Sequence, residues 1–208
     1  MKAVLRMQKI KSLGDYKRTT AHSSRRTQPE NANPKGFHTA IKEPPRPLES
    51  ILPAKRRKDA VIAIEMVLSA SPDYFKAGID TIKWTARTKS FLEKEFGENL
   101  HEVYFHDDEQ TPHIHAFIIP KTADGRLCAK EFTNRKQLVK WQDDYAKALD
   151  GTGIQRGLRG SKAKHEEVTK YYGVIAKALD NGISLEDLNN MIEEKIEETQ
   201  QAQAGRVP

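Results

Sequence analysis

The stretch that decides the fold is His106-Asp-Asp-Glu-Gln-Thr-Pro-His113-Ile-His115, where three of the chain's seven histidines fall within ten positions. The run that begins at His113 is apolar, contains isoleucines and is bounded by prolines, which indicates a β-strand. Residues two apart on a strand point to the same face, so His113 and His115 project side by side. His106 ends another run, residues 100–106, that also reads as a strand. The stretch therefore predicts a β-hairpin that carries three imidazoles.

Clustered imidazoles are typical of a metal site, because neutral imidazole is the commonest metal-ligating side chain. Three such ligands leave coordination positions open for water or substrate, as catalytic sites require. A lone histidine in an apolar strand is usually only a hydrogen-bonded core residue. Two at i, i+2 spacing with a third across a turn favour the metal interpretation, and His106, His113 and His115 are the predicted ligands.

Two further runs predict strands that pair with the hairpin. Residues 3–10 place Ala3, Leu5 and Met7 on one face, and residues 60–69 are a nearly continuous apolar run interrupted by Glu65. A carboxylate inside such a strand is costly unless it is paired or used. Glu65 is therefore either a core ion-pair partner or an active-site group. It shares the histidines' face only if its strand pairs in a suitable register.

Helix signals flank these strands. Ser71 and Pro72 begin a predicted helix that Gly97 can end, and Asn134 with Gln137 resembles a capping box for a second helix. The first helix carries Phe75, Ile79, Ile82 and Ala86 at helical spacing. The pattern predicts an α+β fold with a central antiparallel sheet flanked by helices, followed by C-terminal helices.

The C-terminal part is expected to differ from the rest. We divide the chain into a catalytic domain over residues 1–180 and an acidic helix with a frayed tail over residues 181–208. The acidic helix carries apolar residues at helical spacing, which would suit dimerisation or contact with a partner.

Positive charge is concentrated at the N-terminal end. Residues 1–58 hold 15 Lys/Arg against 4 Asp/Glu, a net charge of +11, whereas residues 59–208 carry a net charge of −5. Such asymmetry suggests a polyanionic partner, and nucleic acid is the natural one, although a solvated basic loop has the same composition. Residues 11–58 also hold six of the ten prolines and show little apolar periodicity, so we expect an irregular functional segment.

Composition excludes other classes of protein. The single cysteine, Cys128, allows no internal disulfide and fits a reducing, cytoplasmic setting. There is no apolar signal region at the N-terminus and no apolar run long enough to span a membrane.

A metal ion beside a basic segment is suited to polarising a phosphodiester. The attacking group could be a metal-bound water, a tyrosine or His22, which has no apolar neighbourhood that would suggest packing. Histidine, with an ordinary pKa of about 6.5, is already largely neutral and nucleophilic near pH 7, whereas tyrosine at about 10 needs more activation. Glu65 could orient the His22 imidazole, as the acidic member of a triad does.

These residues resemble the Mob/Pre (MOBV) plasmid mobilisation relaxases of the HUH endonuclease superfamily. The resemblance rests on His106-x-Asp-Glu-x-Thr-Pro-His113-x-His115, on Arg6-Met-Gln-Lys, on Lys58-Asp-Ala-Val and on His22 followed by Arg25, and it covers roughly residues 1–175. It implies the HUH relaxase-like fold and an enzyme that nicks one strand of single-stranded or hairpin DNA at a plasmid transfer origin, in the bacterial cytoplasm. The enzyme would stay attached to the 5′ phosphate.

The resemblance also implies roles for individual residues. His22 matches the family's nucleophile, which would form a phosphoramidate, and Glu65 matches an active-site glutamate. The three histidines would bind Mn²⁺ or Mg²⁺, although imidazole also accepts Zn²⁺ readily. Asp108 and Glu109 would hold the ligands or the turn. The residues expected to contact DNA are Arg6, Arg25, Arg26, Arg57, Lys58, Arg156, Arg159, Lys162 and Lys164.

Two other functions stay open at this point. One is a related HUH nuclease or transposase that uses a tyrosine, with Tyr16 or Tyr104 as the candidate. No tyrosine lies between His22 and Glu65, which favours His22. The other is a non-catalytic DNA-binding protein with a structural metal, which would require a closed, four-ligand site.

Overall fold

The four predicted strands and a fifth, from the segment expected to be irregular, pair into one five-stranded antiparallel sheet with the order β1-β3-β5-β4-β2. The computed structural model describes residues 1–29, 32–76, 81–159 and 184. The strands are β1 (Ala3–Ile10), β2 (Phe37–Lys42), β3 (Ala63–Ala70), β4 (Leu100–Asp107) and β5 (His113–Ile118). The apolar β3 takes a central position, as its continuous burial requires. β4 and β5 form the predicted hairpin, with His106 opposite His113.

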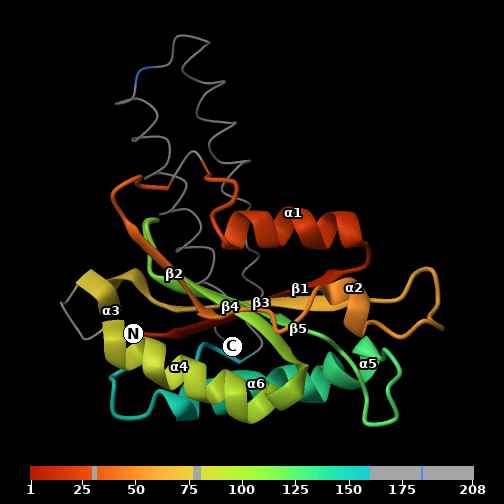
Figure 1. Cartoon of the computed structure of the whole chain (residues 1–208). Helices are drawn as coiled ribbons and strands as arrows, with labels where there is room; N and C mark the ends of the chain where they lie inside the picture. The colour runs from red at the N-terminus through yellow and green to blue at the C-terminus, as the bar shows by residue number, and fades with distance from the viewer. Residues whose placement is uncertain (30–31, 77–80, 160–183, 185–208) are drawn as a thin grey trace. The chain divides into compact units, whose positions relative to one another are not determined.

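The helices are α1 (Leu13–Ser23), α2 (Leu48–Ile51), α3 (Pro72–Lys76), α4 (Thr81–Phe96), α5 (Ala129–Phe132) and α6 (Arg135–Ala148), with a 3-10 turn at Gly97–Asn99. α1 covers one face of the sheet, and α4 with α6 covers the other (Figure 1). Asn134 caps α6 as predicted, because its side chain accepts a hydrogen bond from the Gln137 backbone at 2.9 Å. The α+β prediction is confirmed.

The sheet separates two apolar clusters. The larger lies between the sheet and the α4/α6 pair and includes Met66, Trp84, Ile114 and Trp141. The smaller lies on the α1 side and includes Tyr16, Leu48, Tyr104 and Phe117. That second face also carries polar residues, and these include the histidines. One face of the sheet thus supplies most of the core and the other carries polar groups.

Two details of the sequence prediction are corrected. Residues 11–58 are not uniformly irregular, because they contain α1, β2 and α2. Tertiary contacts stabilise these elements: Tyr16 of α1 is buried, and β2 pairs with β4. On α4 the buried face carries Trp84, Phe91 and Leu92. Ile82, predicted at an apolar position, is 82% exposed instead, because packing of the larger Trp84 sets the helix phase.

Every helix and strand named above belongs to one compact unit, Met1–Leu158. Residues Arg159–Pro208 belong to a second unit. The predicted C-terminal helices and the division at residue 180 lie outside the described residues. Among the described residues, no helix has the length and apolar character that crossing a membrane requires.

Candidate metal centre and nucleophile

The β4–β5 hairpin brings the three predicted ligands into contact. The centroids of the His106 and His113 rings are 5.0 Å apart, those of His106 and His115 are 4.8 Å apart, and those of His113 and His115 are 4.9 Å apart. His106 and His115 are buried and His113 is half-buried. The i, i+2 spacing and the pairing of His106 with His113 produce this cluster directly.

One nitrogen of each ring is held by a partner outside the cluster. The acceptors are the Ser23 carbonyl for His106 Nε2 at 2.6 Å, the Thr111 carbonyl for His113 Nδ1 at 2.9 Å, and Glu65 Oε1 for His115 Nδ1 at 2.7 Å. A carbonyl or carboxylate oxygen can only accept, so each of these nitrogens carries the proton. This fixes the tautomer and leaves the other nitrogen of every ring with a free lone pair.

The three lone pairs suit a divalent metal ion. His106 Nδ1 and His113 Nε2 lie 3.2 Å apart, and one ligand atom from each of the three rings falls within 4.8 Å of the others. Among the described residues, His115 Nε2 is buried without any hydrogen-bond partner. An unpaired buried polar atom is costly, and a bound cation would satisfy it. The donor set therefore fits a metal with three protein nitrogens.

Burial keeps these ligands neutral. Burial, with the neighbouring His115 as a further cause, lowers the pKa of His106 to about 3. Burial also holds the pKa of His115 well below its ordinary value, with His113 acting in the same direction. Metal binding requires neutral imidazole, so both ligands are in the binding form at neutral pH.

Glu65 has a partner different from the predicted one. The register in which β3 pairs with β5 places Glu65 on the same face as the histidines. Its carboxylate accepts a hydrogen bond from His115 and not from His22. Burial raises the pKa of Glu65 to about 7, while the nearby His22 and His113 oppose that rise. In this structure Glu65 orients the ring of His115, a predicted metal ligand, and acts on His22 only through its charge.

His22 lies on the last turn of α1, over the metal ligands. Its ring centroid is 6.3 Å from that of His106 and 5.9 Å from that of His115. Burial lowers the pKa of His22, and the Arg25 cation lowers it further. His22 is therefore neutral at pH 7 and close to the ion that the three histidines would hold.

Arg25 fixes the end of α1 to the hairpin. Its Nε donates to Asp108 Oδ2 at 2.7 Å, and its Nη2 donates to Asp108 Oδ1 and Glu109 Oε1, each at 2.6 Å. Its side chain is 3% exposed. The predicted contact between Arg25 and DNA does not fit this placement, because the buried guanidinium is already committed to the carboxylates of Asp108 and Glu109 and to the His22 carbonyl. The fork geometry of Arg25 joins His22 to the metal hairpin instead.

Asp108 and Glu109 thus take the turn-holding position predicted for them. Burial opposes ionisation of Asp108, but hydrogen bonds from Arg25 outweigh it and lower the pKa of this carboxyl. Glu109 Oε1 also lies 3.8 Å from His106 Nδ1 and 3.7 Å from His113 Nε2. It is therefore next to the metal position as well as to Arg25.

The tyrosine candidates are poorly suited to attack. Tyr16 and Tyr104 are buried, and both hydroxyls donate to the buried carboxylate of Glu102. Burial, followed by the charge and hydrogen bonding of Glu102, raises the pKa of Tyr16. The same causes raise the pKa of Tyr104. Neither phenol is exposed or activated as a nucleophile must be.

The other predicted DNA contacts differ in placement. Arg6 is exposed on β1 and shares its face with His115, through the pairings of Arg6 with Val67 and of Val67 with His115. Three of the predicted contacts are exposed within the basic segment, residues 1–58: Arg26, Arg57 and Lys58. The first residue of the second unit, Arg159, is also exposed. Arg156 is largely buried and pairs with Asp143, which does not fit a free phosphate contact. Lys162 and Lys164 lie outside the described residues.

The sequence prediction missed His38. It lies on β2 directly opposite His106, with its Nδ1 4.0 Å from Asp108 Oδ2. Its side chain is 46% exposed, in contrast to the buried His106. The useful signal was a histidine followed by Thr-Ala-Ile in a proline-rich segment, but no alternation marked that segment as a strand.

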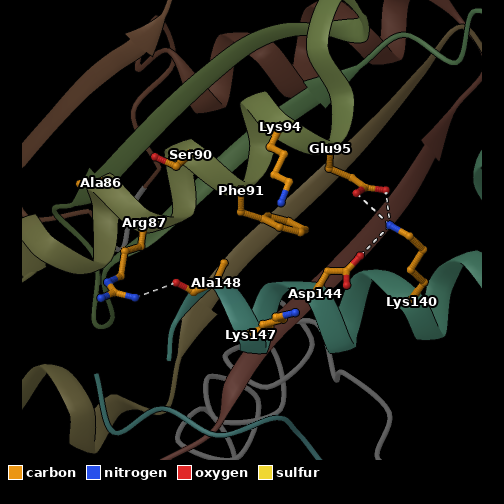
Figure 2. Close-up of a pocket in the computed structure, with 10 residues that line it drawn as sticks. All are labelled: Ala86, Arg87, Ser90, Phe91, Lys94, Glu95, Lys140, Asp144, Lys147 and Ala148. Carbon is orange, nitrogen blue, oxygen red and sulfur yellow. Dashed lines mark hydrogen bonds and ion pairs between the residues drawn. The ribbon is translucent and has the colours of Figure 1, made fainter. Parts of the chain in front are cut away.

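A separate cavity lies away from the histidines. A cavity of about 640 Å³ between α4 and α6 is lined by charged and small residues around Phe91. Figure 2 shows Lys140 between Glu95 and Asp144, and Arg87 bonded to the carbonyl of Ala148. This cavity is on the side of the sheet opposite α1, so it has no part in the histidine cluster.

Comparison with known proteins identifies the family of the chain. The family model Mob_Pre, described as plasmid recombination enzyme, matches residues 1–173. A 65 kDa protein of Zymomonas mobilis is 35% identical over 194 residues, covering 85% of this chain and 33% of that protein. A plasmid recombination enzyme type 3 of Staphylococcus aureus is 36% identical over 151 residues, covering 68% and 36%. The chain spans about a third of the length of these relatives.

Solved structures share the fold. The relaxase domain of MobM, bound to oriT DNA of plasmid pMV158 and to Mn, superposes with a TM-score of 0.70 at 24% identity, covering 84% of this chain and 100% of that one. A second crystal structure of the domain, with a 23-nucleotide oriT DNA, gives 0.69 at 25% identity, covering 85% and 99%. With the family match over most of its length, the chain belongs to the Mob_Pre family of plasmid recombination enzymes.

Proposed function

We propose that this chain is the catalytic part of a metal-dependent DNA relaxase, which nicks one strand at a plasmid transfer origin and forms a covalent bond to the 5′ phosphate through His22. The observation that carries this proposal is the position of the neutral His22 ring about 6 Å from two predicted metal ligands. The DNA-bound, Mn-bound state of the related MobM domain supports the substrate class and the ion.

The reaction is a transesterification at phosphorus. The unprotonated nitrogen of His22 attacks the scissile phosphorus, a P–N bond forms, and the bond from phosphorus to the 3′ oxygen breaks with its electron pair. The 3′ oxygen leaves and takes up a proton from solvent, while the phosphorylated His22 ring, formed as a cation, releases its remaining N–H proton to solvent and retains the 5′ phosphate as a phosphoramidate. Reversal by an incoming 3′ hydroxyl would rejoin a strand.

The chain's own residues prepare each reactant. Arg25 holds the last turn of α1, and its Nη1 donates to the His22 carbonyl at 3.2 Å. Its Nη1 also lies 3.5 Å from His22 Nε2. A metal ion on the three histidines would offset the charge that develops on the phosphate oxygens. We propose Mn²⁺ as the bound ion, because the site offers three imidazole nitrogens and Mg²⁺ prefers oxygen ligands.

The test is adduct formation with a labelled single-stranded origin oligonucleotide and Mn²⁺. His22→Ala should abolish the covalent adduct while leaving Mn²⁺ affinity unchanged, because His22 is not among the ligands. Tyr16→Phe and Tyr104→Phe should still form it. Mass spectrometry should find the nucleotide on His22, and acid should release it, since a P–N bond is far more acid-labile than a phosphotyrosine. An undiminished adduct in His22→Ala would overturn the assignment.

A non-catalytic DNA-binding role with a structural metal makes a different prediction. It requires salt-dependent DNA binding by the Mn²⁺-loaded protein without any strand cleavage. The three-nitrogen site argues against it, because structural sites are normally closed by four protein ligands.

A further inference from the structure

Tyr16 joins α1 to the sheet in the half of the helix that precedes His22. Its hydroxyl donates to Oε1 of Glu102 on β4, and its ring packs edge-on against Phe117 of β5, with 5.8 Å between the ring centroids. Both Tyr16 and Glu102 are buried. His22 follows six positions later in the chain, which is about 9 Å along a helix axis. The hydrogen bond therefore attaches to the sheet the part of α1 that leads into the proposed nucleophile.

A second attachment lies at the other end of α1, beyond His22. The Ser23 carbonyl accepts a hydrogen bond from His106, and the Arg25 guanidinium binds carboxylates at the turn of the β4–β5 hairpin. A helix held at one point alone can pivot about that point, whereas a second attachment fixes its direction as well. Because His22 lies between the two attachments, together they determine where its ring lies over the predicted ligands.

A register shift in β4 aims Glu102 at α1. Leu100 lies opposite Ile118. Glu102, two positions later, lies opposite Phe117, only one position back along β5. Without this shift Leu100 and Glu102 would share one face of the strand. Instead Leu100 packs in the larger cluster on the α4/α6 side, while Glu102 faces the helix, and such bulges commonly re-aim a side chain beside a functional site.

Glu102 depends on two hydroxyl partners. Oε1 accepts from Tyr16, and Oε2 accepts from Tyr104 at 2.6 Å. A buried carboxylate is costly unless hydrogen bonds satisfy it, so both bonds stabilise Glu102 in this position. Tyr104 lies on the same strand as Glu102. Of these two bonds, only the one from Tyr16 connects the sheet to α1.

We propose that Tyr16 and Glu102 are positioning residues that set the place and direction from which His22 attacks the phosphate. Neither is a predicted metal ligand, and both are buried, so they act through the helix rather than on the substrate. This role rests on the proposed function, because it has a meaning only if His22 is the nucleophile. A displacement of about 1 Å in a reacting group can cost about 100-fold in rate. Loss of the bond should therefore slow the attack without weakening the binding of DNA or metal.

The variant Tyr16→Phe tests the role, because it removes the hydroxyl and keeps the ring. The measurement is the rate of adduct formation with saturating Mn²⁺ and a saturating single-stranded origin oligonucleotide. We expect this rate to fall about tenfold, which corresponds to a helix displacement smaller than about 1 Å. The dissociation constants for DNA and for Mn²⁺ should keep their wild-type values. Loss of rate without loss of affinity is the signature of a misplaced nucleophile.

Tyr104→Phe is the matched control, because it removes the other hydroxyl from Glu102 without detaching α1. Both variants leave a buried carboxylate with one donor, so their melting temperatures should fall alike. Only Tyr16→Phe should lose rate. Tyr145→Phe removes a buried hydroxyl on the other side of the sheet, where it bonds Trp84 and the Ser69 carbonyl, and should also react at the wild-type rate.

Substitutions of Glu102 test the same bond from the side of the sheet. Glu102→Gln keeps an oxygen that can accept from Tyr16, so it should retain most of the rate. Glu102→Met offers no acceptor and should react as slowly as Tyr16→Phe. Combining Tyr16→Phe with Glu102→Met should slow the reaction no further, because both changes remove one shared contact.

The two proposals fail in different ways. A wild-type protein that binds Mn²⁺ but forms no adduct overturns the relaxase function, and an adduct that survives in His22→Ala overturns the nucleophile. If the wild type does form the His22 adduct, three results overturn only the positioning role. These are a Tyr16→Phe variant that reacts at the wild-type rate, one that loses affinity instead of rate, and equal slowing of Tyr16→Phe and Tyr104→Phe in line with their stability.

Discussion

At the scale of single residues, Glu65 is positioned to tune a metal ion that the three histidines would bind. Its Oε1 accepts the His115 Nδ1–H inside a buried strand, which fixes the ligand's orientation and increases its basicity. Glu65→Gln keeps an acceptor but removes the charge. We expect Mn²⁺ to bind about tenfold more weakly, since changes to such outer partners typically cost 10- to 100-fold. Titration calorimetry measures this, with the exposed Glu49→Gln as control. Equal affinity in both variants would contradict the role.

The same buried ligands predict how the metal-free protein responds to acid. The pKa of His106 is lowered to about 3, against about 6.5 in an unfolded chain. Between these values the unfolded state binds a proton that the folded state does not, so stability is complete above pH 6.5 and falls toward pH 3. At pH 5 the loss is about 2 kcal/mol at 1.36 kcal/mol per pH unit. Urea unfolding at pH 7 and 5 measures it, and His106→Asn should show a smaller difference. A urea-unfolding midpoint that is the same at pH 7 and pH 5 would refute this prediction.

At the scale of elements, the contact between β2 and the hairpin depends on Gly36. Gly36→Ala would put a methyl group 2.4 Å from the Asp108 Cα, so strand or turn must move. Overpacking of this kind typically costs about 1–3 kcal/mol. The shift would also disturb the Asp108–Arg25 pair that holds His22. We expect a lower melting temperature and slower adduct formation.

Gly14→Ala provides the comparison for that variant. Gly14 lies in the first turn of α1, and its nearest neighbour to an added Cβ is Ser12 Oγ at 3.8 Å. Alanine is favoured over glycine in helices, so stability should stay equal or rise. If both glycine variants behave alike, the close approach at Gly36 has no consequence.

The elements also show what sequence could predict. The β4–β5 hairpin was predictable because its signals are local: an i, i+2 histidine pair, a polar turn and flanking prolines. The strand order β1-β3-β5-β4-β2 was not, since it depends on contacts between distant segments. For this reason the face on which Glu65 lies stayed open in the sequence prediction, and its hydrogen-bond partner is His115 and not His22. His38 was missed because pairing of β2 with β4, rather than any periodicity of its own, makes it part of the site.

Arg25 and Arg156 illustrate a further limit. A basic residue in a basic segment has the same sequence signature whether it contacts a phosphate or a buried carboxylate. Only the folded chain places Arg25 against Asp108, which is 83 positions away. Charge runs therefore indicate a class of partner but do not predict the individual contacts.

At the scale of the whole molecule, the sheet divides the positive charge between two sides. Arg6 lies on the histidine face, and Arg57 with Lys58 follows α2, whose Leu48 packs in the α1-side cluster. The cavity of Figure 2, with Lys94 and Lys147, lies on the other side. If DNA binds only along the histidine face, the positive charges on that side will strengthen DNA binding more than those around the cavity on the other side.

The salt dependence of binding separates the two sides. For single-stranded DNA the logarithm of affinity falls with the logarithm of salt concentration by about 0.7 per phosphate contact. The double variant Arg57→Gln, Lys58→Gln should reduce that slope by about 1.4 if both residues contact phosphates. The matched double variant Lys94→Gln, Lys147→Gln removes the same charge and should leave the slope unchanged, with affinity shifted only slightly by net charge. Fluorescence anisotropy between 50 and 300 mM salt, roughly the range in which such contacts are measured, supplies both slopes. Equal reductions would mean that the enzyme attracts DNA through its total charge, and the one-sided path would be wrong.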